Sequence, residues 1–124
     1  NANPDSFKTA IDVLSKANSH RILVMGDMGE LGEHAEKSHR EVGAYAKKAQ
    51  LNTLYAVGIN SAAASEEFNG RHFPNQDSLI DSLKARIIEL EAQHESVTIL
   101  VKGSRSSVME NIIQALVSGG KSSC

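Results

Sequence analysis

Three segments of the 124-residue sequence combine residue types that could do chemistry. In G-D-M-G-E-L-G, residues 26–32, Asp27 stands among three glycines directly after the apolar run at 21–25. In K-G-S-R, residues 102–105, two cations flank a hydroxyl behind the most strand-like stretch of the chain. The third segment carries His39 on the apolar side of a predicted helix. These groups can bind ribose hydroxyls, phosphates or carboxylates.

Asp27 admits three interpretations. The glycines follow the spacing G-x-x-G-x-x-G, which differs from the dinucleotide fingerprint G-x-G-x-x-G, so a pyrophosphate-binding turn is not supported. An acid at the end of a parallel strand can accept hydrogen bonds from a ribose, or it can hold a metal ion through water. It can also cap the turn that follows. The spacing alone leaves these three roles open.

The K-G-S-R segment at 102–105 carries the largest number of groups that could bind an anion. Backbone N–H groups at a helix start, the Ser104 hydroxyl, and the Lys102 and Arg105 cations could converge on a phosphate or a carboxylate, and a carboxylate matches the planar fork of arginine. The alternative is that Ser104 caps the helix and Arg105 is a surface cation. For His39, the favoured alternative is a core residue whose ring is satisfied by a backbone carbonyl.

Several familiar chemistries are not supported. His34 and His39 are five residues apart and do not share a helix face as the histidines of H-E-x-x-H do, and the one cysteine is Cys124, so we expect no metal site made by this chain alone. No G-x-S-x-G elbow is present. The P-loop pattern G-x-x-x-x-G-K-[ST] is also missing. If the protein uses ATP, another domain must supply that loop.

Composition predicts one packed domain over residues 1–124. Hydrophobic residues make up 40% and charged residues 23%, which is typical of a globular protein. The net charge of −2 and the aromatic content of 4% do not favour nucleic-acid binding. No apolar run approaches the roughly 18 to 20 residues of a membrane span, and the polar N-terminus is not a signal peptide. With a single cysteine, these features predict a cytoplasmic protein.

Short apolar runs alternate with amphipathic stretches along the chain. The predicted strands cover residues 21–26, 53–58, 71–73 and 97–102, with 71–73 near an edge. The predicted helices cover about 5–16, 35–50, 61–68, 77–93 and 105–117. We expect Asn3 to cap the first helix, Asp77 or Ser78 to cap the fourth, and Gly119-Gly120 to stop the last. This alternation favours an α/β fold, a three-layer Rossmann-like domain with a mainly parallel sheet flanked by helices.

The predicted core and the predicted site follow from this fold. The first helix should bury Phe7, Ile11 and Leu14. The apolar positions of the last helix are Val108, Met109, Ile112, Ile113 and Leu116. In an open parallel sheet, ligands collect at the carboxyl ends of the strands, where both Asp27 and K-G-S-R are expected to lie.

Four segments together resemble the C-terminal domain of the Mur ligases. They are N-A-N-P-D-S at 1–6, G-D-M-G-E-L-G at 26–32, H-R-E-V-G at 39–43, and V-K-G-S-R-S with M-E at 101–106 and 109–110. They occur in the order and spacing of that family, and the resemblance covers nearly the whole chain. Ala2 stands where several sister ligases have histidine, and the D-N-P-R motif is missing. Both features favour the branch that adds D-alanyl-D-alanine.

The resemblance implies a fragment, residues 1–124, of a three-domain, ATP-dependent amide ligase of peptidoglycan synthesis. In such enzymes ATP phosphorylates the carboxylate of UDP-N-acetylmuramoyl-tripeptide, and the amine of D-alanyl-D-alanine attacks the acyl phosphate. The central domain brings the P-loop and the Mg²⁺ ligands, and the N-terminal domain holds the UDP-sugar. This third domain closes over the site, so the isolated chain is not expected to catalyse the reaction.

The resemblance also implies roles for individual residues. Asp27 matches the acid that contacts the ribose, and Asn3 lies in a motif next to the adenine site. Lys102, Ser104 and Arg105 match a motif that faces the active-site cleft, where they are expected to engage the dipeptide carboxylate or the transferring phosphate. His39 matches a motif position with either a substrate-binding or a packing role. The alternative to the ligase is a free-standing module that binds a nucleotide or an anion.

Overall fold

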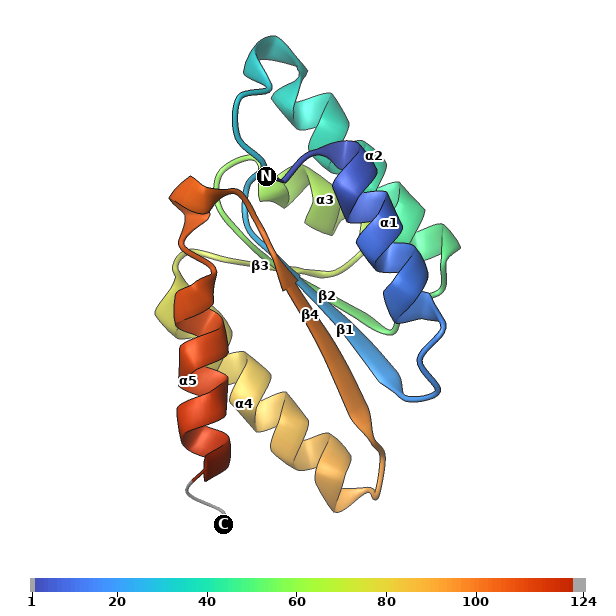
Figure 1. The fold of residues 1–124 in the computed structure, drawn as a ribbon, viewed down its shortest axis with the longest axis vertical. Coiled ribbons are helices and arrows are strands. Elements are labelled where there is room, and N and C mark those ends of the chain that lie inside the picture. The colour runs from blue at the N-terminus through green and yellow to red at the C-terminus, as the bar shows by residue number, and fades with distance from the viewer. Residues whose placement is uncertain (1, 122–124) are drawn as a thin grey trace.

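A parallel sheet in the strand order β3-β2-β1-β4 forms the centre of the structure, a computed structural model that describes residues 2–121 (Figure 1). The strands are β1 (His20–Met25), β2 (Thr53–Val57), β3 (Arg71–Phe73) and β4 (Val97–Lys102). All three strand pairs are parallel, which confirms the predicted α/β fold. The short β3 lies at one edge, as predicted. Asn1 and Cys124 lie outside the described residues.

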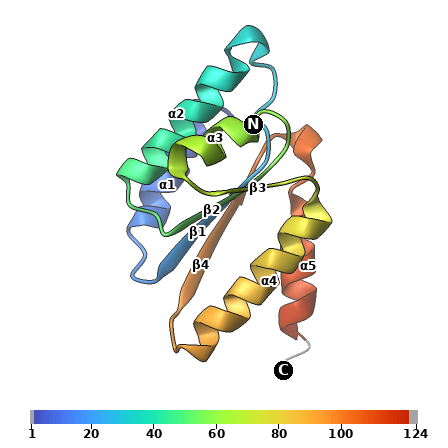
Figure 2. The same cartoon turned by 180° about the vertical axis from the view of Figure 1, so that it is seen from behind.

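Helices cover both faces of the sheet. They are α1 (Pro4–Ser15), α2 (Ala35–Lys48), α3 (Ser61–Phe68), α4 (Gln76–Ala92) and α5 (Glu110–Lys121), with 3₁₀ turns η1 (Gly32–His34) and η2 (Arg105–Ser107). Figures 1 and 2 show from opposite sides that α1, α2 and α3 lie on one face and α4 and α5 on the other. Within the described residues, no helix is both long enough and apolar enough to cross a membrane.

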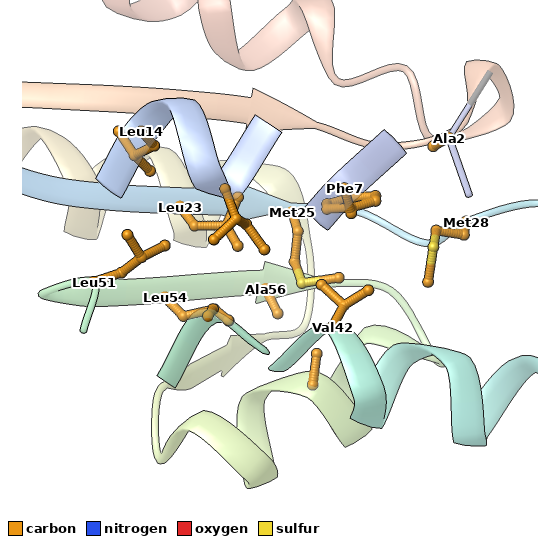
Figure 3. Packing of buried hydrophobic residues seen from close by; sticks show 13 residues of the cluster. Ala2, Phe7, Leu14, Leu23, Met25, Met28, Val42, Leu51, Leu54 and Ala56 are labelled. Atoms are coloured by element: carbon orange, nitrogen blue, oxygen red, sulfur yellow. The ribbon is translucent and has the colours of Figure 1, made fainter. Parts of the chain in front are cut away.

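Two hydrophobic cores explain why β1 is apolar at successive positions. Leu23 and Met25 face the first core, where they pack with residues of α1 and α2 such as Phe7 (Figure 3). Ile22 and Val24 face the second core, which α4 and α5 cover. A strand buried on both faces has no polar positions to alternate with, so its sequence is a continuous apolar run.

The helix caps agree with the prediction for α1 and correct it for α4. The Asn3 side chain accepts a hydrogen bond from the Ser6 N–H at 2.8 Å, and the Ser6 hydroxyl accepts one from the Asn3 N–H at 3.0 Å. With Pro4 in the first turn, this is a capping box. The cap of α4 is Asn75, not Asp77 or Ser78. Asn75 has an extended backbone, from which its Oδ1 reaches the Ser78 N–H at 2.8 Å.

The predicted last helix was wrong in its start, its end and part of its buried face. Instead of one helix over 105–117, the chain forms η2, a left-handed residue at Val108, and then α5, which continues through Gly119-Gly120 to Lys121. Because the break at Val108 resets the helical phase, the buried stripe begins at Met109 and continues at Ile112. Val108 and Ile113 are 43% and 46% exposed instead of buried.

Candidate functional site

The carboxyl ends of β1 and β4 are joined at one edge of the sheet. The Gly26 N–H donates to the carbonyl of Lys102, and the Ser104 N–H donates to the carbonyl of Asp27, both at 2.9 Å. These bonds extend the parallel β1–β4 ladder by one step beyond the strands. The structure therefore brings Asp27 and the K-G-S-R segment together, as the strand-end argument predicts.

The Asp27 carboxylate caps a helix that begins more than thirty residues later in the chain. Its Oδ1 accepts hydrogen bonds from the Ser61 N–H and the Ser61 hydroxyl, each at 2.8 Å. Its Oδ2 accepts one from the Asn60 N–H at 3.2 Å. A carboxylate at the start of α3 also interacts favourably with the helix dipole. The cap that the sequence analysis considered was on the turn that follows Asp27, but the carboxylate caps α3 instead.

This arrangement still leaves Asp27 able to bind a ligand. The Asp27 side chain is 26% exposed, and a carboxylate offers about four lone-pair sites, of which the α3 contacts use three. Gly58, which follows β2, has a φ of +115°, and a β-carbon there would overlap the Asp27 carboxylate. Glycine is therefore required at Gly58 both for its backbone conformation and to make room for the acid.

Ser61 and Asn60 were not singled out from the sequence. The available signal was a predicted strand at 53–58 that ends in glycine and is followed by a helix beginning at Ser61. That pattern marks a strand end at the same edge of the sheet, but it does not show which side chain occupies the helix start.

His39 is fully buried, and both of its ring nitrogens have partners. Nε2 accepts a hydrogen bond from the Met28 N–H at 2.9 Å, so the proton is on Nδ1, which donates to the Ala35 carbonyl at 2.6 Å. Nε2 also lies 4.0 Å from Oδ1 of Asp27. The ring thereby fixes the backbone directly after Asp27. Its substrate-binding role stays a prediction, and in this structure the ring does not reach the surface.

The rest of the H-R-E-V-G motif joins α2 to α3. Arg40 forms ion pairs with Glu66 and Glu67 of α3, both at 3.2 Å, and with Glu36 of its own helix at 3.1 Å. A β-carbon at Gly43 would overlap the backbone of α3. Exposed ion pairs contribute little to the free energy of folding, so the close approach at Gly43 is the stronger link between the two helices. The motif thus supports the packing of α2 against α3, the helix whose first residue bonds to Asp27.

The side chains at the end of β4 are less constrained. The Lys102 ammonium lies 5.5 Å from the ring centroid of Phe7. Ser104 is buried and sits at the cap position of η2, but its side chain makes no capping hydrogen bond. Its hydroxyl instead lies 2.9 Å from the Ser106 hydroxyl and 3.2 Å from that of Ser107. The turn thus gathers three hydroxyl groups.

Arg105 is the exposed cation of this turn. Across residues 2–121, its guanidinium has no hydrogen bond or ion pair. Two surface grooves flank it, one lined by Gly29 and Glu30 and the other by Met109 and Ile113. An uncommitted guanidinium between grooves is available to a carboxylate or phosphate ligand.

Asn3 lies at the same end of the sheet. Ala2, its neighbour, packs in the core cluster that contains Met28 (Figure 3). Since Oδ1 of Asn3 already caps α1, a ligand contact would fall to its side-chain amide nitrogen. Among the described residues, no three His, Cys, Asp or Glu side chains gather as they would to hold a metal ion.

The comparisons with known proteins agree with this geometry. The profile of the family described as "Mur ligase, glutamate ligase domain" matches residues 1–105. The chain belongs to the Mur ligase family. It is 43% identical over 116 residues to the UDP-N-acetylmuramoyl-tripeptide–D-alanyl-D-alanine ligase of Haemophilus influenzae, covering 94% of this chain and 25% of that protein. The Escherichia coli protein of the same name is 42% identical, with 97% and 26% coverage.

Solved structures extend the likeness to three dimensions. A crystal structure of MurF from Acinetobacter baumannii matches with a TM-score of 0.84 at 32% identity, covering 95% of this chain and 26% of that one. This Mur ligase chain thus spans about a quarter of the length of the relatives it matches.

Proposed function

We propose that the protein to which this chain belongs is an ATP-dependent ligase that adds D-alanyl-D-alanine to UDP-N-acetylmuramoyl-tripeptide. One observation carries the proposal: two relatives named for this reaction are 43% and 42% identical over 94% and 97% of the chain. Both sites at the sheet edge suit these substrates. Asp27 presents a hydrogen-bond acceptor for the nucleotide, and the K-G-S-R segment presents cations for a carboxylate or a phosphate.

In this proposal Asp27 and Asn3 contact the nucleotide. The remaining lone pair of Asp27 accepts from a ribose hydroxyl, and its orientation is fixed in advance by the α3 N-terminus. Asn3 contacts the adenine through its amide nitrogen. In this proposal the central domain supplies the P-loop and the Mg²⁺ ligands, because the pattern G-x-x-x-x-G-K-[ST] does not occur in this sequence.

Arg105, Lys102 and Ser104 bind the second substrate or the transferring phosphate. The dipeptide carboxylate suits the planar guanidinium of Arg105, whose charge has no partner within the described part of this chain. Lys102 and the serine hydroxyls add further donors on the same turn. His39 does not contact a ligand directly in this proposal. It holds the backbone at Met28, the residue that follows Asp27.

The chemistry explains why a separate closing domain is needed. ATP converts the tripeptide carboxylate to an acyl phosphate, the dipeptide amine attacks it, and phosphate leaves. An acyl phosphate reacts with water, so a domain that closes over the site protects the intermediate and brings the amine to it. Because ATP is made and kept inside the cell, we place the protein in the cytoplasm.

The test is a ligation assay on the full-length protein. Purified enzyme is mixed with ATP, Mg²⁺, UDP-N-acetylmuramoyl-tripeptide and D-alanyl-D-alanine, and the ligated product is followed by mass together with phosphate release. L-alanyl-L-alanine serves as the matched control substrate, and residues 1–124 alone serve as a control protein expected to be inactive. Nucleotide binding without any ligation would contradict the proposal and favour a free-standing binding module. The parent reading frame gives a cheaper check, because it must encode a P-loop upstream.

A further inference from the structure

The turn that carries Arg105 is held by a side chain of α4, the helix that covers the same face of the sheet as α5. Gln76 is the first residue of α4, and its Nε2 donates to the Ser107 carbonyl at 2.8 Å and to the Val108 carbonyl at 3.2 Å. One amide group thus binds two successive carbonyls at the end of η2. No sequence motif pointed to Gln76.

The two carbonyls flank a residue in an unfavourable conformation. Val108 has φ 50° and ψ 46°, in the left-handed region. For a β-branched residue this conformation is a true outlier, since the branched side chain crowds the backbone. Such a conformation persists only where the surrounding structure imposes it. Two local backbone bonds also involve Val108: its N–H donates to the Arg105 carbonyl at 3.2 Å, and its carbonyl accepts from the Asn111 N–H at 3.3 Å. Gln76 adds the bonds to this backbone that come from a distant element.

The same turn has two further attachments. The Ser107 hydroxyl donates to the Asp27 carbonyl at 2.9 Å. Met109 packs so closely against Gly26 and Gly103 that a β-carbon on either glycine would come within 2.6 to 2.7 Å of its side chain. These contacts fix Ser107 and Met109 to the strand ends. The peptide between them, at Val108, is the part that Gln76 holds.

We propose that Gln76 is a positioning residue, which holds the left-handed Val108 and thereby aims the Arg105 turn at the incoming substrate. The inference rests on the proposed function for the identity of that substrate, the D-alanyl-D-alanine carboxylate. Gln76 itself touches no reacting atom. Without its two hydrogen bonds, Val108 relaxes to a common backbone conformation and displaces Arg105, three residues earlier.

The test is a double-mutant cycle in the full-length enzyme with Gln76→Ala and Val108→Gly. Gln76→Ala should raise KM for D-alanyl-D-alanine roughly tenfold, the size expected when strain of this kind is released, and leave KM for ATP unchanged. Glycine adopts the left-handed region without penalty, so Val108→Gly in the Gln76→Ala background should restore most of the lost dipeptide affinity. Gln93→Ala, at the other end of α4, is the matched control and should change neither constant.

Hydrogen exchange gives a second measurement that does not depend on activity. The Val108 amide, which donates to the Arg105 carbonyl at 3.2 Å, should exchange faster in Gln76→Ala, and its protection should return in the double variant. An unchanged KM for the dipeptide together with unchanged exchange would overturn the inference. So would a double variant as impaired as Gln76→Ala. If the wild-type enzyme does not ligate at all, the proposed function fails, and the exchange data alone decide whether Gln76 holds the turn.

Discussion

The loop after β1 and the turn after β4 meet at one edge of the sheet. Among the described residues, the charged group of the loop is hydrogen-bonded within the protein, whereas that of the turn is not. The Asp27 carboxylate accepts three hydrogen bonds from Ser61 and Asn60 and is partly buried. The Arg105 guanidinium is exposed and, within residues 2–121, unpaired. The first group is oriented before any ligand arrives, whereas the second has to be ordered by the ligand at a cost in side-chain entropy. Substitutions at Asp27 should therefore affect both folding and binding, and substitutions at Arg105 should affect binding alone.

Arg105→Ala should have the largest effect on activity. In the full-length enzyme we expect kcat/KM for D-alanyl-D-alanine to fall by about 2 to 4 kcal/mol of transition-state stabilisation, because a desolvated carboxylate loses its partner. KM for ATP and the urea midpoint should hardly change. The matched control is Arg71→Ala on β3, whose guanidinium stacks on Phe73 away from this site. Undiminished use of the dipeptide would show that Arg105 is a surface cation only.

His39→Ala should have the largest effect on stability. It leaves the buried Met28 N–H without its partner, removes the bond from the ring to the Ala35 carbonyl and opens a cavity, so the free energy of unfolding should fall by about 2 to 3 kcal/mol. Urea denaturation of the 124-residue chain measures this loss. The exposed His34→Ala is the control. If the two variants lose the same stability, the ring of His39 does not hold the loop.

Two substitutions, Asp27→Ala and Asp27→Asn, separate the capping role of Asp27 from its proposed contact with the ribose. Asp27→Ala removes the cap of α3 and should lower the free energy of unfolding by about 1 to 2 kcal/mol. It should also raise KM for ATP more than KM for D-alanyl-D-alanine. Asparagine retains a capping oxygen, so Asp27→Asn should keep most of the stability. An unchanged ATP dependence in both variants would refute the ribose contact.

Ser61→Ala should have the smallest effect on stability and activity. It tests whether the bonds that cap α3 also orient Asp27 for the nucleotide. It removes one of the three hydrogen bonds to the Asp27 carboxylate while the backbone N–H bond remains, so a loss of about 1 kcal/mol of folding stability is expected. KM for ATP should rise slightly, since the acid is less well oriented. Ser82→Ala in the middle of α4 should be neutral by both measurements. A rise in KM for the dipeptide instead would mean that Ser61 acts on the β4 turn.

Much of the fold was predictable because local patterns specify it. The limits of α3 and β4 agree with the prediction, and the other strands differ from it by one residue at most. Continuous apolar runs mark strands buried on both faces, and the spacing of Phe7, Ile11 and Leu14 marks the buried side of α1. The last helix was the exception. Its apolar spacing was compatible with a start at Arg105, and nothing local indicated that Val108, a β-branched residue, would adopt a left-handed conformation.

The sequence by itself determined that Asp27 and the K-G-S-R segment stand at strand ends, since each follows an apolar run directly. Parallel pairing of those strands then places both at one edge of the sheet. Only the tertiary structure decided what each residue does there. Asp27 faces donors 33 and 34 positions further along the chain, and they reach it because α2 packs closely on α3 through Arg40 and Gly43. His39 is enclosed by the same packing, and Gln76 reaches the β4 turn from 31 residues away. Hydrogen bonds over such separations depend on how whole elements pack against one another, which the local periodicity of a sequence does not specify.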